Sequence, residues 1–105
     1  MDYKERLKDK IHGMLAGVTI GDALGLPVET MSRAAIAQLN NGQGVYEYMD
    51  PVGIRGGDTH GLTRGSTSDY WQFTRSVACS LTKKKGFDIH DQALAHTIEY
   101  GRSTF

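Results

Sequence analysis

The chain has 105 residues, with twelve Lys and Arg against twelve Asp and Glu, so its formal net charge is zero. This balance argues against a general nucleic-acid-binding protein, which needs an excess of basic residues to displace counterions from phosphates. The single cysteine excludes an internal disulfide and suits a reducing compartment, so we expect a cytoplasmic protein. The length fits one domain or part of one.

The first predicted element is a helix from about Lys4 to Ile20. Apolar residues recur along one stripe at helical spacing, with charged residues opposite: Leu7, Ile11, Met14, Leu15 and Val18. The longest apolar stretch, Met14 to Val28, is too short for a membrane span and is interrupted by Asp22 and Pro27, so we expect no membrane association. Pro27 should also move Leu26 out of the helical conformation, which ends or sharply turns the helix.

Glycine recurs at every fourth position from Gly13 to Gly25. Each glycine weakens a helix by about 1 kcal/mol relative to alanine, so the repeat needs an explanation. The spacing favours close packing of another helix against this stripe. Alternatively, the segment from Gly21 to Gly25 shapes a turn at a functional site.

A short helix is predicted from Arg33 to Leu39. Ser32 is a suitable N-cap for it, and Asn40-Asn41-Gly42 should end it. Residues 41–66 are rich in glycine and lack periodicity, which predicts a long loop held in place by apolar side chains. Within this loop, residues 44–49 could form a strand, but the sequence offers no partner strand for it.

Two further helices complete the prediction. One runs from about Asp69 to Lys83, with Gly86 at its C′ position. The other runs from about Ile89 to Tyr100 and is capped by Asp88. Because no convincing strand is present, the pattern predicts an all-α fold with a long Gly-rich loop.

Two polar segments could carry chemistry. Ser68 and Asp69 place a hydroxyl and a carboxylate at a helix start, where they either cap the helix or bind a hard cation such as Mg²⁺. Glu29 follows a proline turn and is either a surface carboxylate or a group that orients or deprotonates water. Asp58-Thr59-His60 could supply a base with its orienting partner, although the four histidines do not form a metal-ligand set.

These segments resemble two motifs of the ADP-ribosylglycohydrolase family, which includes the dinitrogenase-reductase activating glycohydrolase. The first match is the Gly21-Asp22-Ala23-Leu24-Gly25 core followed by Pro27-Val28-Glu29. The family's second motif is Thr-Asp-Asp-Thr-Gln at a helix start, and Ser68-Asp69-Tyr70-Trp71-Gln72 is similar to it. We prefer this register to one beginning at Thr67, because Gln72 then matches. The resemblance spans nearly the whole chain.

The resemblance implies an all-α bundle whose cleft holds two divalent cations, Mg²⁺ or Mn²⁺. It also implies hydrolysis of the glycosidic bond between ADP-ribose and a modified side chain. The partner would be an ADP-ribosylated protein or an ADP-ribose-like small molecule. Carried over by residue, Ser68 and Asp69 would be metal ligands, and Glu29 would be the catalytic acidic residue near the scissile bond.

This sequence departs from the family pattern in two ways. Tyr70 stands where the second Asp of the motif belongs, and a phenol with a pKa near 10 is a poor ligand for a divalent cation at neutral pH. A later Asp-x-Asp metal motif of the family has no counterpart, so residues 1–105 should correspond to the N-terminal portion of such a domain. We therefore expect hydrolysis by this chain to be impaired or absent. The alternative is a non-catalytic module that binds ADP-ribose or a protein.

A partial bundle of this kind should expose an apolar face. On the second long helix that face consists of Phe73, Val77 and Leu81, which repeat every four residues. A second copy of the chain could cover them, which predicts a homo-oligomer.

Overall fold

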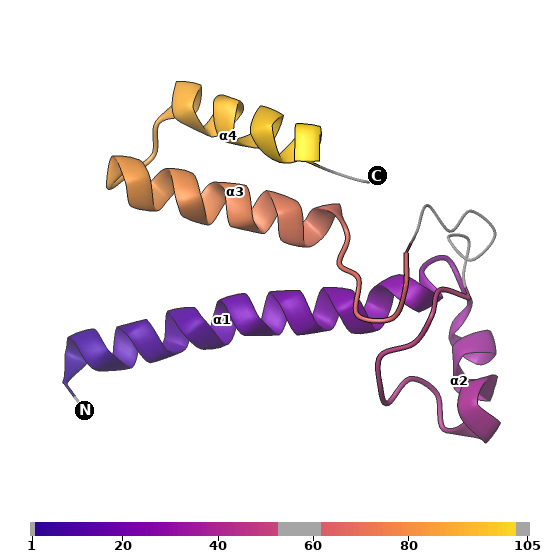
Figure 1. Cartoon of the computed structure of the whole chain (residues 1–105). Coiled ribbons are helices and arrows are strands. Elements are labelled where there is room, and N and C mark those ends of the chain that lie inside the picture. Colours follow the sequence, from indigo (N-terminus) through magenta and orange to yellow (C-terminus); the bar gives the residue numbers. More distant parts are fainter. Residues whose placement is uncertain (1, 53–61, 103–105) are drawn as a thin grey trace. The chain divides into compact units, whose positions relative to one another are not determined.

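A computed structural model describes residues 2–52 and 62–102 (Figure 1). In these two ranges every regular element is a helix, so the prediction of an all-α fold is confirmed. The chain divides into two compact units, one comprising Met1–Thr19 with Asp69–Phe105 and the other comprising Ile20–Ser68.

The first helix, α1, spans Tyr3–Gly25 and begins with a reciprocal cap. The Asp2 carboxylate accepts the backbone N–H of Glu5 at 2.8 Å, and the Glu5 carboxylate accepts the backbone N–H of Asp2 at 3.1 Å. This exchange satisfies amide groups that a helix start otherwise leaves without partners.

The predicted end of this helix near Ile20 is wrong, because α1 continues through the glycine-rich motif to Gly25. The α-helix does end there, directly before the segment that contains Pro27, as the proline predicts. The chain then enters a 3₁₀-helix, η1, over Leu26–Val28, so Leu26 also keeps a helical conformation. Pro27 lies in the first turn of η1, where its missing N–H costs no hydrogen bond. The alternative of a turn at Gly21–Gly25 is therefore wrong as well.

Close packing against the glycine stripe is not seen in the part of the chain that the structure describes. A Cβ atom placed on Gly13, Gly17, Gly21 or Gly25 would meet nothing within 4 Å there. Among the same residues, one helical stretch, Tyr3–Val28, is long and apolar enough to cross a membrane by length and composition alone. That is weak evidence, since core helices of soluble proteins pass the same test.

Helix α2 spans Arg33–Gly42 and confirms the predicted cap. The Ser32 hydroxyl accepts the backbone N–H of Ala35 at 3.0 Å. The predicted stop is also confirmed, because Asn40 and Asn41 adopt positive φ angles of 53° and 59°. Asparagine tolerates this left-handed conformation better than most residues.

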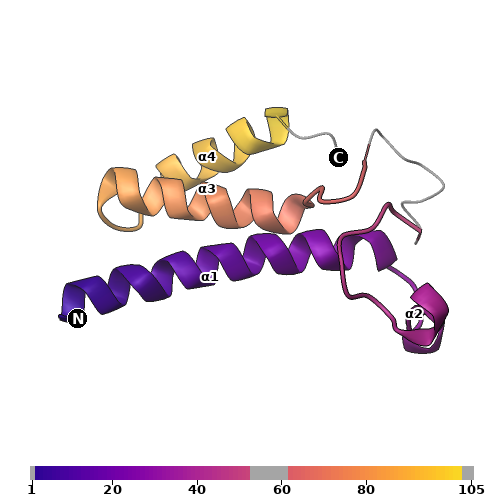
Figure 2. The ribbon, with the colours of Figure 1, turned by 60° about the horizontal axis from the view of Figure 1, so that its bottom comes forward.

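Helix α3 spans Asp69–Lys84 and helix α4 spans Ile89–Arg102, and the two pack as an antiparallel hairpin (Figures 1 and 2). The predicted cap of α4 is confirmed, since the Asp88 carboxylate accepts the backbone N–H of Asp91 at 2.9 Å. At the end of α3 the prediction was off by one residue. Lys85, not Gly86, adopts the left-handed conformation, with φ of 56°, and the Gly86 N–H bonds the Leu81 carbonyl at 3.2 Å.

The interface between α3 and α4 is polar. Ser76 and Ser80, one turn apart on α3, are only 1% and 2% exposed. The Ser80 hydroxyl donates to Asp91 Oδ2 at 2.7 Å, and Lys83 Nζ lies 2.6 Å from Asp91 Oδ1. These contacts lower the pKa of Asp91, the Lys83 hydrogen bond most and the Ser80 hydrogen bond next. Burying polar groups is favourable only when they are paired, so these contacts fix how the two helices meet.

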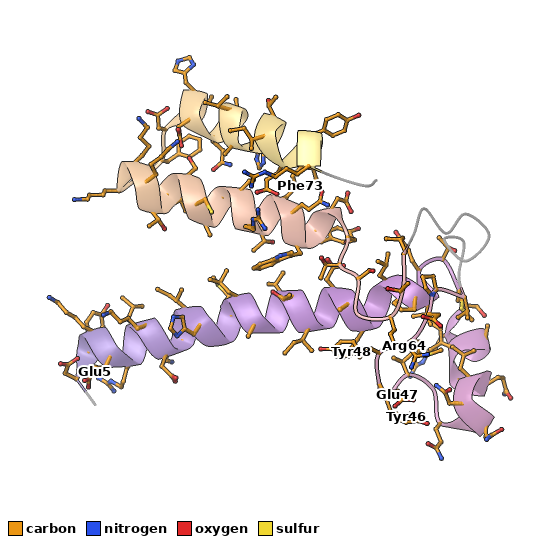
Figure 3. All side chains as sticks on the ribbon, viewed as in Figure 1. Glu5, Tyr46, Glu47, Tyr48, Arg64 and Phe73 are labelled. Atoms are coloured by element: carbon orange, nitrogen blue, oxygen red, sulfur yellow. The ribbon has the colours of Figure 1, made fainter. Side chains whose placement is uncertain are left out.

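Farther along the same interface, His96 lies among polar and aromatic partners. The Ser76 hydroxyl donates to the Phe73 carbonyl at 3.0 Å, so it can accept the Nδ1–H of His96. Gln92 Nε2 lies 3.3 Å from His96 Nε2. The ring of Phe73, labelled in Figure 3, meets the His96 ring edge-on with centroids 5.3 Å apart.

The apolar residues of α3 face outward, as predicted. Phe73, Val77 and Leu81 are 48%, 39% and 40% exposed. Together with residues of α1 and α4 they line an apolar groove of about 840 Å³ within the first unit. The expectation that a second copy of the chain covers this face stays a prediction.

Replacing Lys85 with glycine should stabilise the protein. Glycine adopts a positive φ without the steric cost that a Cβ atom imposes, so we expect Lys85→Gly to gain roughly 0.5–1 kcal/mol. Thermal unfolding followed by circular dichroism measures the change. Lys84→Gly is the matched control, because it places glycine at the last residue of α3 and should give no gain in stability. Equal destabilisation by both variants would contradict the assignment of Lys85 to the left-handed position.

The lowered pKa of Asp91 predicts acid sensitivity of the α3–α4 hairpin. The stabilisation from this carboxylate is fully present above the ordinary pKa of 3.8 and is lost as the pH falls through the lowered value. Asp91→Asn should therefore lower the melting temperature at neutral pH and flatten its dependence on acid. Asp9→Asn, on the exposed surface of α1, is the control. If the acid profiles of the two variants coincide, the Asp91 contacts do not stabilise the fold.

Candidate functional site

Within the second unit, Asp22 of the first motif contacts Ser68, the first residue of the second motif. The backbone N–H of Ser68 donates to Asp22 Oδ2 at 2.7 Å, and its hydroxyl donates to Asp22 Oδ1 at 2.6 Å. Ser68 is 3% exposed, whereas Asp22 is half-buried. Hydrogen bonds to an ionised carboxylate are about twice as strong as neutral ones, so this double contact is a firm link within the unit.

A turn just ahead of Ser68 sets the direction of the chain. The Ser66 N–H donates to the Thr63 carbonyl at 3.1 Å, and the Ser66 hydroxyl accepts the Thr63 N–H at 3.2 Å. Gly65, at the third position of this turn, has φ of 84°, which a side chain would make unfavourable. Arg64, labelled in Figure 3, also forms an exposed ion pair with Asp50 at 3.5 Å.

The segment before Glu29 is held by burial and by backbone hydrogen bonds. Leu26, Pro27 and Val28 are buried, together with Ala23 and Leu62. The Val52 N–H donates to the Pro27 carbonyl at 2.8 Å, which ties the Gly-rich loop to η1. This small apolar cluster is the core of the second unit and fixes the backbone on which Glu29 stands.

Glu29 is half-buried at the end of η1. Its backbone N–H donates to the Leu26 carbonyl at 3.2 Å, and its own carbonyl accepts the Thr30 hydroxyl at 2.5 Å. Thr30 has φ of 72°, a conformation that a β-branched residue rarely adopts. Strain of this kind costs about 1–3 kcal/mol and persists where the surroundings impose it.

Asp69 and Tyr70 open helix α3 and belong to the first unit. Asp69 is half-buried, and Tyr70 is 69% exposed. The Tyr70 carbonyl accepts the Thr74 hydroxyl at 2.8 Å within α3.

Of the residues predicted for the site, the second unit contains Ser68 and Glu29. Asp22, which contacts Ser68, was missing from the predicted site. Its place in the Gly-Asp-Ala-Leu-Gly core was the signal that could have identified it. Asp58-Thr59-His60 lies outside the described residues. Within residues 2–52 and 62–102, no group of three or more His, Cys, Asp or Glu side chains could hold a metal ion.

Comparison with protein families identifies the class of this domain. A family model described as ADP-ribosylglycohydrolase matches residues 3–104. The all-α chain with its two linked motifs is therefore a glycohydrolase-type domain. It belongs to the ADP-ribosylglycohydrolase family. Searches of curated proteins and of solved structures gave no match.

The divalent cation implied by this family can be tested against the donors present. Ser68 and Asp69 carry oxygen donors, which are the ligands that Mg²⁺ prefers. The Ser68 hydroxyl gives its proton to Asp22, a geometry compatible with cation binding through the oxygen. Both residues carry donors of the right kind, but these two donors do not by themselves make a cation site. One hydroxyl and one carboxylate are fewer ligands than such an ion requires, so further oxygens must come from a bound ligand or from water.

Restoring the family carboxylate at position 70 should strengthen cation binding. We expect Tyr70→Asp to raise the affinity for Mn²⁺ by about tenfold or more, because a second carboxylate adds charge and a hard oxygen donor. Electron paramagnetic resonance of free Mn²⁺ measures the affinity. Tyr70→Asn, which removes the phenol without adding charge, is the matched control. Equal affinities for these two variants would show that position 70 does not face the cation.

Proposed function

We propose that this domain acts on ADP-ribose-linked substrates by hydrolysing the glycosidic bond to a modified side chain, with Mg²⁺ or Mn²⁺ as cofactor. Within the family we propose the dinitrogenase-reductase activating type, from the similarity of the first motif. The substrate would be an ADP-ribosylated protein or an ADP-ribose-like small molecule in the cytoplasm. The observation that supports the proposal is the double hydrogen bond between Asp22 of the first motif and Ser68, the first residue of the second motif.

Each predicted residue has a definite task in this reaction. Ser68 and Asp69 would hold the cation, which, when bound, supplies a positive charge for the ribose hydroxyls and lowers the pKa of water. Glu29 would accept a proton from the attacking water as its oxygen bonds to the anomeric carbon. The bond from that carbon to the side chain breaks, and the leaving nitrogen or oxygen takes up a proton.

The chain by itself should bind ADP-ribose more readily than it hydrolyses its conjugates. Tyr70 replaces a carboxylate, so the cation has little protein-derived charge around it. The diphosphate of ADP-ribose can supply the missing oxygens, as substrate phosphates do for Mg²⁺ in many enzymes. Binding of ADP-ribose should therefore require the cation.

Tyr70 also favours the alternative of a non-catalytic module. With 69% of its surface exposed, its ring can contact a ligand or a protein without any metal. ADP-ribose binding that is independent of Mg²⁺ would support this second function.

Calorimetric titration of the 105-residue chain with ADP-ribose, with and without Mg²⁺, tests these proposals. We expect binding only with Mg²⁺, at least tenfold weaker in Asp69→Asn and unchanged in Glu29→Gln. With ADP-ribosyl-arginine as substrate, Glu29→Gln should lower whatever turnover the parent chain shows by roughly 10²–10⁴-fold. Absence of binding under both conditions would overturn both ADP-ribose-binding functions and leave the protein-interaction form of the alternative.

A further inference from the structure

We propose that the first turns of α1 bind an anionic lipid surface, with the helix lying along that surface. The segment concerned is residues 3–14 of the first unit, and every residue in it is exposed. The proposal is independent of the glycohydrolase activity, because it uses none of the residues of the candidate site.

Apolar side chains form one row along these turns of α1. Tyr3, Leu7 and Ile11 stand four residues apart, and Met14 continues the row one turn farther on. Their exposed fractions are 72%, 45%, 43% and 57%. Single exposed apolar residues are common on proteins, but a continuous row of about three turns indicates an interaction surface.

The apolar row continues into the groove of the first unit. Ile11 and Met14 line this groove together with Phe73, Val77 and Leu81 of α3. The apolar surface is therefore wider than one helix face. Binding of a helix to a lipid surface strengthens with the apolar area that it buries, so the groove adds to the row.

Basic residues border the apolar row on both sides. At helical spacing the pairs on the two sides are Lys4 with Lys8 and Arg6 with Lys10. The second border forms a surface hollow of about 330 Å³, which is lined by Tyr3, Leu7, Arg6 and Lys10. Positive charge thus lies directly beside the apolar side chains.

Acidic residues occupy the side of α1 opposite to the apolar row. Glu5 and Asp9 lie about one turn apart, and each is nearly half a turn away from Leu7 around the helix axis. Residues 2–10 contain four basic and three acidic residues, so their charges almost cancel in sum. The separation of the two signs, and not an excess of one sign, distinguishes this helix.

This distribution of charge fits an anionic lipid surface. A surface-bound helix inserts its apolar side between the lipids, and Lys and Arg at its borders reach the headgroup phosphates while their methylene stems cover apolar surface. Glu5 and Asp9 then face water, away from the anionic headgroups. A second copy of the chain fits the row less well, because in a symmetric dimer the basic borders of the two copies would face each other.

The far end of α1 favours a helix on the surface over a membrane span. The stretch Tyr3–Val28 passes the length and composition test for a span, but Asp22 within it accepts two hydrogen bonds from Ser68. A span would place this carboxylate in hydrocarbon, which is costly. Surface binding differs from the sequence-based expectation of no membrane association, which rested on the requirements for a span.

Flotation with lipid vesicles tests the proposal on the 105-residue chain. We expect binding to vesicles of equal parts phosphatidylserine and phosphatidylcholine to be about tenfold tighter, or more, than binding to phosphatidylcholine alone. Added salt should release the chain, because ions screen the attraction between the basic borders and the headgroups. Equal binding to the two kinds of vesicle, or binding to neither, would overturn the proposal.

Exchanging two charges tests their arrangement without changing the net charge. In the double variant with Asp9→Lys and Lys10→Asp, a carboxylate enters one border and a lysine moves to the acidic side. We expect binding to the anionic vesicles to weaken by about tenfold. The helix itself should not be weakened, because positions 5 and 9, and positions 6 and 10, then carry opposite charges one turn apart. Circular dichroism checks the helix content, and unchanged vesicle binding would contradict the proposal.

A pair of glutamine variants tests the apolar row. Leu7→Gln places an amide in the row, whereas His12→Gln, the matched control, places the same side chain on the polar side of α1. We expect the first to weaken binding to anionic vesicles by about tenfold and the second to change it by less than about twofold. Equal effects would show that the row does not meet the lipid. A stable dimer that binds no vesicles would show that a second copy covers the row, and the proposal would fail.

Discussion

The contact between Asp22 and Ser68 is the constraint on which the second unit depends. It joins two residues that lie 46 positions apart, and it closes the chain around a core of only a few apolar side chains. Closing a loop of this length costs conformational entropy that a small core offsets poorly. Two charge-assisted hydrogen bonds to one residue provide the specificity that the core lacks. The motif residues thus define the unit as well as its candidate site.

The first unit is also held together by polar contacts, but these lie between two helices. Its hairpin buries serine, aspartate and glutamate between α3 and α4 and leaves apolar side chains on the outside. Burial of apolar side chains therefore contributes little to the packing of α3 against α4. Paired polar groups permit few alternative registers, because a shifted helix would leave buried groups without partners. The register of the hairpin is thus determined by hydrogen bonds such as that of Ser80 with Asp91.

Interactions between residues close in sequence were predictable from the sequence, whereas those between distant residues were not. Helix caps at Ser32 and Asp88 were predictable, because a capping side chain and its amide lie three residues apart. Pro27 indicated that the first α-helix stops near it, as it does at Gly25, but local rules did not decide between a break and the 3₁₀ turn that follows. The motif could have marked Asp22 as a site residue, but its pairing with Ser68 was not predictable. No local pattern connects Ser68 with Asp22, although both residues were noted within motifs.

The same contact bears on how this domain would hold its cation. The Asp22 carboxylate accepts two hydrogen bonds from Ser68, so Asp69 remains the carboxylate that the family resemblance places on the ion itself. Tyr70 adds no carboxylate there. A dication with so little protein-derived charge is retained only when a ligand brings anionic oxygens of its own. On the proposed function, the diphosphate of ADP-ribose and the cation should therefore bind together, each raising the affinity of the domain for the other by the same factor.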